Sequence, residues 1–152
     1  MRKVEMRRAT ADDVDLLWTI FRASLKDYII EARGEWNEER EESQFWRQLD
    51  LSASRIIAVD HQHIGFIVAP IRDGALWIHT ICIVPEYQRK GIGTGVIRSV
   101  FAEGKEQEIP IYLGILKVNP ARRLYERLGF KVIGDLPNHY KMQFQSDRID
   151  QE

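Results

Sequence analysis

A basic, glycine-spaced turn in the middle of the chain is the part of the sequence best suited to chemistry. Gly91 and Gly93 stand two residues apart, shortly after Arg89 and Lys90. Glycine lets the backbone come close to a ligand because no Cβ intervenes, and a strand that turns into a helix presents free N–H groups to an anion. The two cationic side chains add positive charge at the same place. The stretch 81–94 therefore predicts a site for the pyrophosphate of a cofactor.

Other signals of a reactive or metal site each have a plainer alternative. A nucleotide P-loop would need Gly-Lys-Ser/Thr, and a dinucleotide-binding fold would need Gly-x-Gly-x-x-Gly; the turn has neither. The single cysteine, Cys82, is either a small buried hydrophobe or an acyl-carrying nucleophile. Strand alternation places it on the opposite face from His79 unless a bulge intervenes. His61 and His63 lack a third ligand, so we expect turn residues and no metal.

The elements that must position the turn follow from the spacing of apolar residues. Helical spacing predicts four helices, which lie within residues 10–25, 38–49, 92–101 and 121–128. Alternating and β-branched runs predict about seven strands, at 4–9, 55–59, 64–69, 75–84, 111–116, 130–133 and 139–144. Tight turns make the second to fourth strands antiparallel, whereas the helix between the fourth and fifth strands makes that pair parallel. The sequence thus predicts one α/β (α+β) domain over 1–146, with a mixed, mostly antiparallel sheet, and a polar tail at 147–152.

Composition indicates a soluble globular protein of ordinary domain size. The 152 residues are 44% hydrophobic and 30% charged, and the net charge of −1 gives no reason to expect nucleic acid. No apolar run approaches the roughly 20 residues that a membrane helix needs, and no apolar stretch of signal-peptide length follows the basic start at 1–8. A single cysteine fits a reducing compartment. We therefore expect a cytoplasmic protein without membrane or nucleic-acid partners.

Two motifs and the order of the predicted elements together resemble the Gcn5-related N-acetyltransferase (GNAT) family. Residues 88–93 read Gln-Arg-Lys-Gly-Ile-Gly and match the family's Gln/Arg-x-x-Gly-x-Gly/Ala signature. Residues 119–130 end in Tyr-Glu-Arg-Leu-Gly-Phe, which is similar to the family's fourth-helix motif. The resemblance covers roughly residues 4–144. One departure is that Asn119 precedes Tyr125 by six residues, where family members more often show seven.

The resemblance implies that acetyl-CoA is the cosubstrate. The main-chain groups of Ile81, Cys82 and Ile83 would pair with its pantetheine arm like an added strand, at the point where the two parallel strands splay apart. Asn119 would hydrogen-bond the cofactor. Tyr125 would protonate the departing thiolate, a transfer that suits a phenol of pKa about 10 and a thiolate of pKa about 8.5. The alternative for Tyr125 is a tyrosine packed on the sheet. The turn that would hold the pyrophosphate comprises Gln88, Arg89, Lys90, Gly91, Ile92, Gly93 and Thr94.

The resemblance further implies direct transfer of the acetyl group to an amine. A neutral amine would attack the thioester carbonyl, a strand N–H would stabilise the oxyanion, and coenzyme A would leave as the thiol. Family members often place a glutamate on the fourth or fifth strand to take the amine proton, and here these positions hold His79 and Gly114. His79, with an ordinary pKa near 6.5, is the predicted base, and a water chain is the alternative. The alternative function is a non-catalytic acyl-CoA sensor or structural protein.

The acceptor is expected to be a primary amine of a small molecule, peptide or protein. In the resembling family the first two helices wall the acceptor side, and here the stretch 27–42 has seven carboxylates facing only Arg33 and Arg40. Such a wall would favour a cationic amine, and the alternative is a solvated helix face. Tyr28 and Trp36 either line the acceptor pocket or belong to the core. A homodimer is one option, since family members often dimerise.

Overall fold

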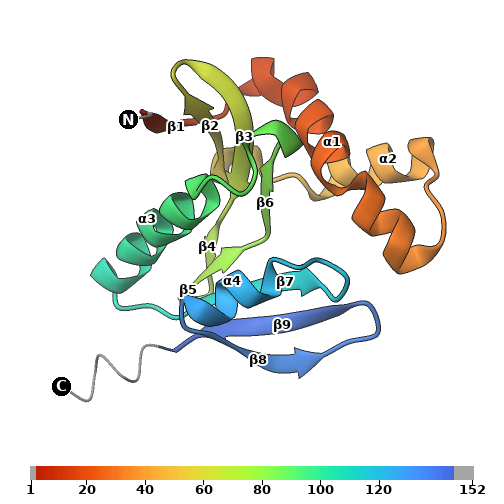
Figure 1. The fold of residues 1–152 in the computed structure, drawn as a ribbon. Coiled ribbons are helices and arrows are strands. Elements are labelled where there is room, and N and C mark those ends of the chain that lie inside the picture. The colour runs from red at the N-terminus through yellow and green to blue at the C-terminus, as the bar shows by residue number, and fades with distance from the viewer. Residues whose placement is uncertain (1–2, 146–152) are drawn as a thin grey trace.

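The strands form two sheets that part from one another in the middle of the molecule (Figure 1). The structure is a computed structural model and describes residues 3–145. The first sheet is antiparallel throughout and contains β1 (Val4–Arg8), β2 (Ser54–Val59), β3 (Gln62–Val68) and β6 (Thr80–Ile83), in the order β1-β2-β3-β6. The second contains β4 (Ile71–Arg72), β5 (Ala75–Ile78), β7 (Ile111–Leu116), β8 (Phe130–Asp135) and β9 (His139–Phe144), in the order β4-β5-β7-β9-β8.

The four predicted helices are all present among the described residues. They are α1 (Val14–Arg33), α2 (Glu38–Gln48), α3 (Ile92–Glu106) and α4 (Arg122–Arg127). The first extends beyond its predicted end because its termination signal is Gly34, which adopts φ 85° and donates its N–H to the carbonyl of Ile30 at 2.7 Å. At its other end the backbone N–H of Thr10 donates to the carboxylate of Asp13 at 2.8 Å.

Helices cover both faces of the first sheet, and strand alternation explains why. Figure 1 shows α1 and α3 on opposite sides of β3 and β6. Phe66 packs in a cluster with residues of α1 and α2, whereas its neighbour Ile67 packs in a second cluster with residues of α3. Successive side chains of a strand point to opposite faces, so a sheet buried on both faces needs apolar residues at consecutive positions. The second cluster continues into β5, β7 and β9 and joins the two sheets.

The strand predicted over 75–84 is broken at His79, and this break separates the sheets. Before it, β5 runs parallel to β7, with Trp77 opposite Tyr112. After it, β6 pairs with β3 instead. The N–H of His79 donates to the carbonyl of Val68 at 2.9 Å, while Thr80 is registered opposite the same residue, which is the arrangement of a β-bulge. The predicted parallel pair is confirmed for β5 and β7, and the sheets part where the chain leaves β7 after β5 and pairs with β3 as β6.

Candidate active site

A cavity of about 510 Å³ brings together most of the residues predicted to hold the cofactor. It lies between β6, the start of α3 and the start of α4. Two of the predicted residues do not line it: Ile92 is buried in the core and Lys90 is exposed. Tyr28, from α1, does line it. The predicted residues on its wall are Ile81, Cys82, Ile83, Gln88, Arg89, Gly91, Gly93, Thr94, Asn119 and Tyr125.

The beginning of α3 forms one end of this cavity. Gly91 has φ 81° at the N-cap, and the N–H of Gly95 makes a bond of 3.1 Å to the Gly91 carbonyl. The N–H groups of the preceding turn therefore have no intrahelical acceptor, and they carry the positive end of the helix dipole. Within residues 3–145, and apart from its chain neighbours and its own helix backbone, a Cβ added at Gly93 would have Ile83 Cδ1, at 3.4 Å, as its only close neighbour. The protein's own packing does not require glycine there, but close approach of a ligand would, and this fits a pyrophosphate.

The free edge of β6 forms the wall next to α3. The N–H of Val84 bonds to the Ile64 carbonyl at 2.9 Å, and Cys82 is registered opposite Phe66. Hydrogen-bonding groups alternate along an antiparallel pair, so Cys82 directs its main chain toward β3 whereas Ile81 and Ile83 direct theirs away. Of the three residues predicted to pair with the pantetheine arm, Ile81 and Ile83 are thus oriented for it.

Two side chains already occupy part of this edge. The Ile83 carbonyl accepts from Gln88 Nε2 at 2.7 Å and from Ser24 Oγ at 3.2 Å. This leaves the N–H of Ile83 and both main-chain groups of Ile81 for a ligand. Sequence reasoning missed Ser24, which comes from α1, because no motif surrounds it.

Asn119 and Tyr125 face the same cavity from the α4 side. Asn119 Oδ1 accepts from the N–H of Ala121 at 2.9 Å, so its carbonyl orders the turn before α4 and its –NH₂ is the group left for a ligand. Tyr125 is buried and its ring lies edge-on to Phe130, with 5.9 Å between centroids. The phenolic oxygen has no hydrogen-bond partner among residues 3–145, yet no buried side-chain oxygen or nitrogen there is unsatisfied. The hydroxyl is therefore reached from the cavity.

Burial keeps both reactive side chains of this cavity protonated. It raises the pKa of the Tyr125 phenol, and the nearby Cys82 raises it further. It also raises the pKa of the Cys82 thiol, an effect that a hydrogen bond with Ser24 partly opposes. A protonated phenol can donate to a thiolate, whereas a protonated, buried thiol is a poor nucleophile. The geometry favours the interpretation of Cys82 as a small buried hydrophobe.

A second cavity, of about 850 Å³, lies on the other side of the break and contains His79. The structure therefore does not place His79 and Tyr125 in one cavity. The two cavities meet along the chain, because His79 and Thr80 line the second and Ile81 begins the first. The pKa of His79 is lowered because partial loss of water disfavours the charged imidazolium and because Arg72 repels it; Asp50 acts in the opposite direction.

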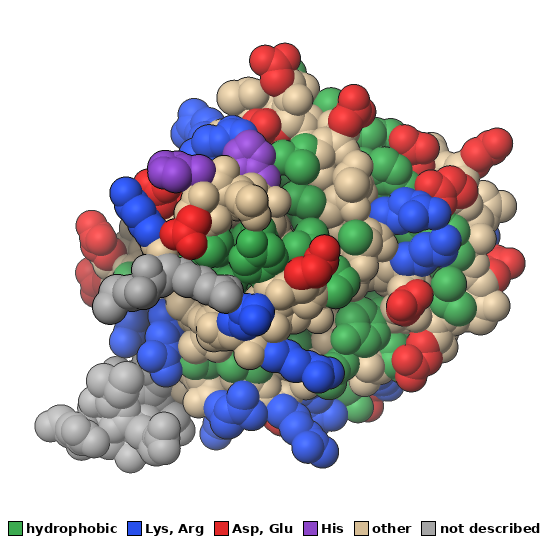
Figure 2. All heavy atoms as spheres, turned by 45° about the horizontal axis from the view of Figure 1, so that its top comes forward, with side chains coloured by type: hydrophobic (Ala, Val, Ile, Leu, Met, Phe, Trp, Pro, Cys, Tyr) green, Lys and Arg blue, Asp and Glu red, His purple; other side chains and the backbone are tan. Residues whose placement is uncertain are grey.

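Trp36 and much of the acidic stretch have structural partners. Trp36 stacks on Trp18, with 6.2 Å between centroids, and donates from Nε1 to Glu38 at 2.6 Å. It lines neither cavity. On the face seen in Figure 2, acidic and basic side chains are interspersed on the side where α1 and α2 lie. The acidic stretch does not form a continuous negative wall there.

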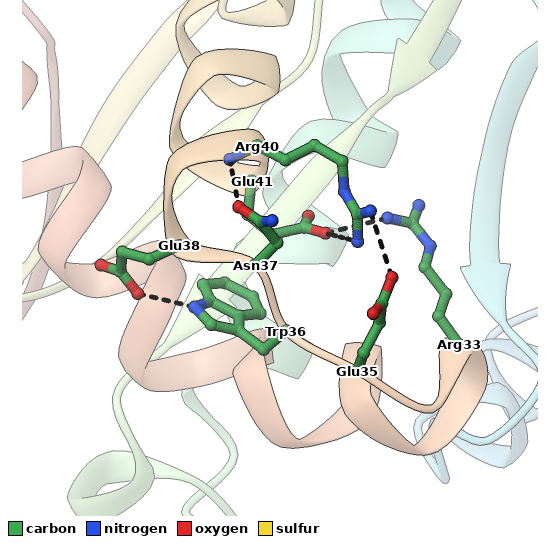
Figure 3. A network of polar contacts seen from close by, with 7 residues as sticks. All are labelled: Arg33, Glu35, Trp36, Asn37, Glu38, Arg40 and Glu41. Carbon is green, nitrogen blue, oxygen red and sulfur yellow. Dashed lines mark hydrogen bonds and ion pairs between the residues drawn. The ribbon is translucent and has the colours of Figure 1, made fainter.

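Glu41 is the member of the acidic stretch that lines the second cavity, and its burial and ion pairs were not predicted from the sequence. Its carboxylate, with a side chain 4% exposed, accepts from Arg33 at 3.2 Å and from Arg40 at 3.5 Å, while Arg40 also reaches Glu35 at 3.2 Å (Figure 3). It lies one helical turn before Phe45, on the side of α2 that is buried. The spacing of four residues between Glu41 and Phe45 places both on the same face of the helix, and it could have predicted that Glu41 is buried.

Comparison with known proteins agrees with this geometry. A strand edge that lies beside a glycine-rich helix N-terminus, with a tyrosine opposite, defines the acyl-CoA N-acyltransferase class of folds. A family model described as the acetyltransferase (GNAT) family matches residues 16–130. The chain belongs to this family.

Individual relatives are distant in sequence and similar in fold. The chain is 29% identical over 82 residues to the [ribosomal protein bS18]-alanine N-acetyltransferase of Haemophilus influenzae, a match that spans only 56% of that relative's length and 53% of this chain. PaiA N-acetyltransferase from Thermoplasma acidophilum, solved in complex with coenzyme A, superposes with a TM-score of 0.77 at 21% identity, over 94% of this chain and 99% of that one. The ribosomal-protein-S18-alanine N-acetyltransferase of Escherichia coli superposes with a TM-score of 0.69 at 16% identity, over 93% of both chains.

Two negative findings concern the described residues alone. Within residues 3–145 no group of three or more His, Cys, Asp or Glu side chains is arranged to hold a metal ion. No helix in that range has the length and apolar character needed to cross a membrane.

Proposed function

We propose that this protein transfers the acetyl group of acetyl-CoA to a primary amine by direct attack on the thioester. The observation that carries the proposal is the content of the first cavity: the open edge of β6, the free N–H groups of α3 and the Tyr125 hydroxyl all line it. The edge suits the amide groups of a pantetheine arm, and the helix terminus suits its pyrophosphate. The similarity to ribosomal-protein alanine N-acetyltransferases supports a protein amino group as one class of acceptor.

Each proposed step uses a group that the structure provides. The thioester supplies an activated acetyl carbonyl, and the neutral amine nitrogen forms a bond to its carbon while the carbon–sulfur bond breaks. The N–H of Ile81, on the open edge, is oriented to donate to the carbonyl oxygen as negative charge develops there. Tyr125 gives its proton to the sulfur. The proton lost by the amine goes to His79, across the break between the cavities, or through water to solvent.

Release of free thiol from acetyl-CoA tests the proposal. A panel of small amines and of peptides with free amino termini is incubated with acetyl-CoA, and thiol is measured against a protein-free control. We expect amine-dependent release of one thiol per acetylated product, with the product identified by mass spectrometry. Coenzyme A binding without turnover on any amine would instead support a non-catalytic acyl-CoA-binding protein of the same fold.

The pH dependence of turnover tests His79. A general base must be neutral, and its lowered pKa means that it becomes protonated only below the ordinary value of about 6.5. In kcat/KM against pH we therefore expect an acidic limb below about 6.5, and His79→Ala should remove it. His139→Ala changes a second histidine of the same cavity and serves as the matched control. If the acidic limb of kcat/KM persists unchanged in His79→Ala, the proton lost by the amine leaves through the water chain instead.

A further inference from the structure

The second cavity is positively charged, which does not agree with the negative wall that was one of the two interpretations of the acidic stretch 27–42. Of the seven carboxylates between 27 and 42, only Glu41 lines it. The other carboxylate on its wall is Asp50. The cationic side chains that line the cavity are Arg33, Arg47, Arg72 and Lys141. Charge within this cavity, rather than charge along the sequence, decides which acceptor it would attract.

Both carboxylates are already neutralised by arginine. Glu41 lies between Arg33 and Arg40 in the network of Figure 3, and its side chain is 4% exposed. Asp50 pairs with Arg72 at 3.0 Å and accepts from Ser52 Oγ at 2.7 Å. A carboxylate that is held by a guanidinium group has little attraction left for an incoming ammonium group.

Lys141, by contrast, has no anionic partner among residues 3–145. It is half-buried, on β9 opposite Gly114 of β7. Its Nζ lies 5.0 Å from the ring centroid of Trp77 and 5.1 Å from that of Tyr112, and these two rings stack with 4.6 Å between centroids. The aromatic pair supports the ammonium group against the cavity wall without neutralising its charge. Gly114 has no side chain, so no group from that position of β7 competes for it.

Arg47, on α2, adds a second uncompensated charge. It lines the same cavity and makes no ion pair within the described part of the chain. The other titratable side chains on the wall are His79 and His139, which are not acids. Arg47 is exposed to solvent, whereas Lys141 is half-buried, and a partly desolvated ammonium group binds a carboxylate more strongly than a fully solvated one does.

We infer that this cavity binds an acceptor amine that carries an anionic group, such as a carboxylate, on the same molecule, with Lys141 as the main ligand of that group and Arg47 as a second. The inference rests on the proposed function for the identity of the reacting amine. It differs from the expectation of a cationic acceptor, because the carboxylates that suggested a cation are paired or lie outside the cavity.

The test uses acceptors that share an amine and differ in charge at the other end. One series is γ-aminobutyrate, γ-aminobutyramide and putrescine; the other is three peptide amides with an N-terminal alanine followed by Asp, Asn or Lys. Binding to the full chain loaded with coenzyme A is measured by NMR titration, so that no turnover occurs. We expect the anionic member of at least one series to bind at least about tenfold more tightly than its neutral partner, and the preference to shrink as salt is added.

Variants at position 141 test whether Lys141 causes the preference for anionic acceptors. Lys141→Met should bring the anionic and neutral members to within about twofold, and Lys141→Arg should retain most of the difference. Lys105→Met removes an exposed cation at the far end of α3 and should change nothing. Equal or tighter binding of the neutral or cationic members by the unaltered protein would overturn the inference, and so would absence of binding by every member. If the anionic members bind preferentially but no amine releases thiol from acetyl-CoA, the proposed function fails while the anion site stands.

Discussion

Tyr125→Phe is expected to lower turnover at least about tenfold and to leave the affinity for coenzyme A unchanged. The substitution removes one oxygen from a ring that otherwise stays packed against Phe130. Because that oxygen has no hydrogen-bond partner among residues 3–145, its loss leaves no buried group unsatisfied. The departing thiolate would then leave without a proton donor. Turnover is measured by thiol release and affinity by calorimetry.

Two further measurements separate a catalytic role from a structural one. The free energy of unfolding of Tyr125→Phe should stay within about 1 kcal/mol of the unaltered protein, since no intramolecular hydrogen bond is lost. Tyr140→Phe is the matched control, because Tyr140 lines neither cavity. An unchanged rate in Tyr125→Phe would assign the tyrosine to packing and would leave the thiolate to be protonated by solvent.

Gly93→Leu should weaken coenzyme A binding by about 100-fold, which corresponds to about 2.8 kcal/mol. The new side chain would start 3.4 Å from Ile83 Cδ1 and would extend into the cavity at the point where the free N–H groups of α3 point. A ligand phosphate could then no longer approach the backbone. Calorimetric titration with coenzyme A measures the effect, and circular dichroism confirms that the variant is folded.

The chain offers a close control for this change. Gly95 lies two residues further along α3 and does not line the cavity. In the described part of the chain, an added Cβ there would meet no atom within 4 Å apart from its chain neighbours and its own helix backbone. Leucine is the better helix former, so both variants should be as thermally stable as the unaltered protein or more so. Gly95→Leu should bind coenzyme A normally. If Gly93→Leu is folded and binds coenzyme A normally, the phosphate lies elsewhere. Gly93→Ala, a smaller change at the same position, should then also bind normally.

The predicted elements agree with the structure where local signals are strong. The four helices are found, and Gly129, with φ 111°, follows α4 as the glycine of a helix C-terminus does. The parallel pairing of strands 75–84 and 111–116 is also confirmed for β5 and β7. The break at His79 was not predicted, because residues 75–84 have the composition of one strand in which only His79 and Thr80 are polar. The segment is divided because its first part, β5, pairs with β7 and its second part, β6, pairs with β3.

Most of the predicted cofactor residues between 81 and 94 gather in one cavity because they are contiguous in the chain. The turn between β6 and α3 is short, so Gly91 and Gly93 line the same cavity as Ile83. Even there, orientation came from the tertiary structure: the register with β3 turns the main chain of Cys82 away from the open edge and leaves Ile81 and Ile83 facing it.

The acceptor side could not be derived in this way, since its residues come from distant segments. Glu41, Gly114 and Lys141 belong to α2, β7 and β9, and they share one cavity only after the two sheets have parted. Seven carboxylates within 27–42 suggested a negative wall, but charge along a chain does not report which side chains are neutralised across space. The sequence by itself determined the family, the fold and the position of the glycine turn that we propose holds the cofactor, because these depend on periodicity and on contiguous backbone. The tertiary structure alone decided the charge of the cavity proposed for the acceptor, because ion pairing and strand register depend on contacts between residues far apart in the chain.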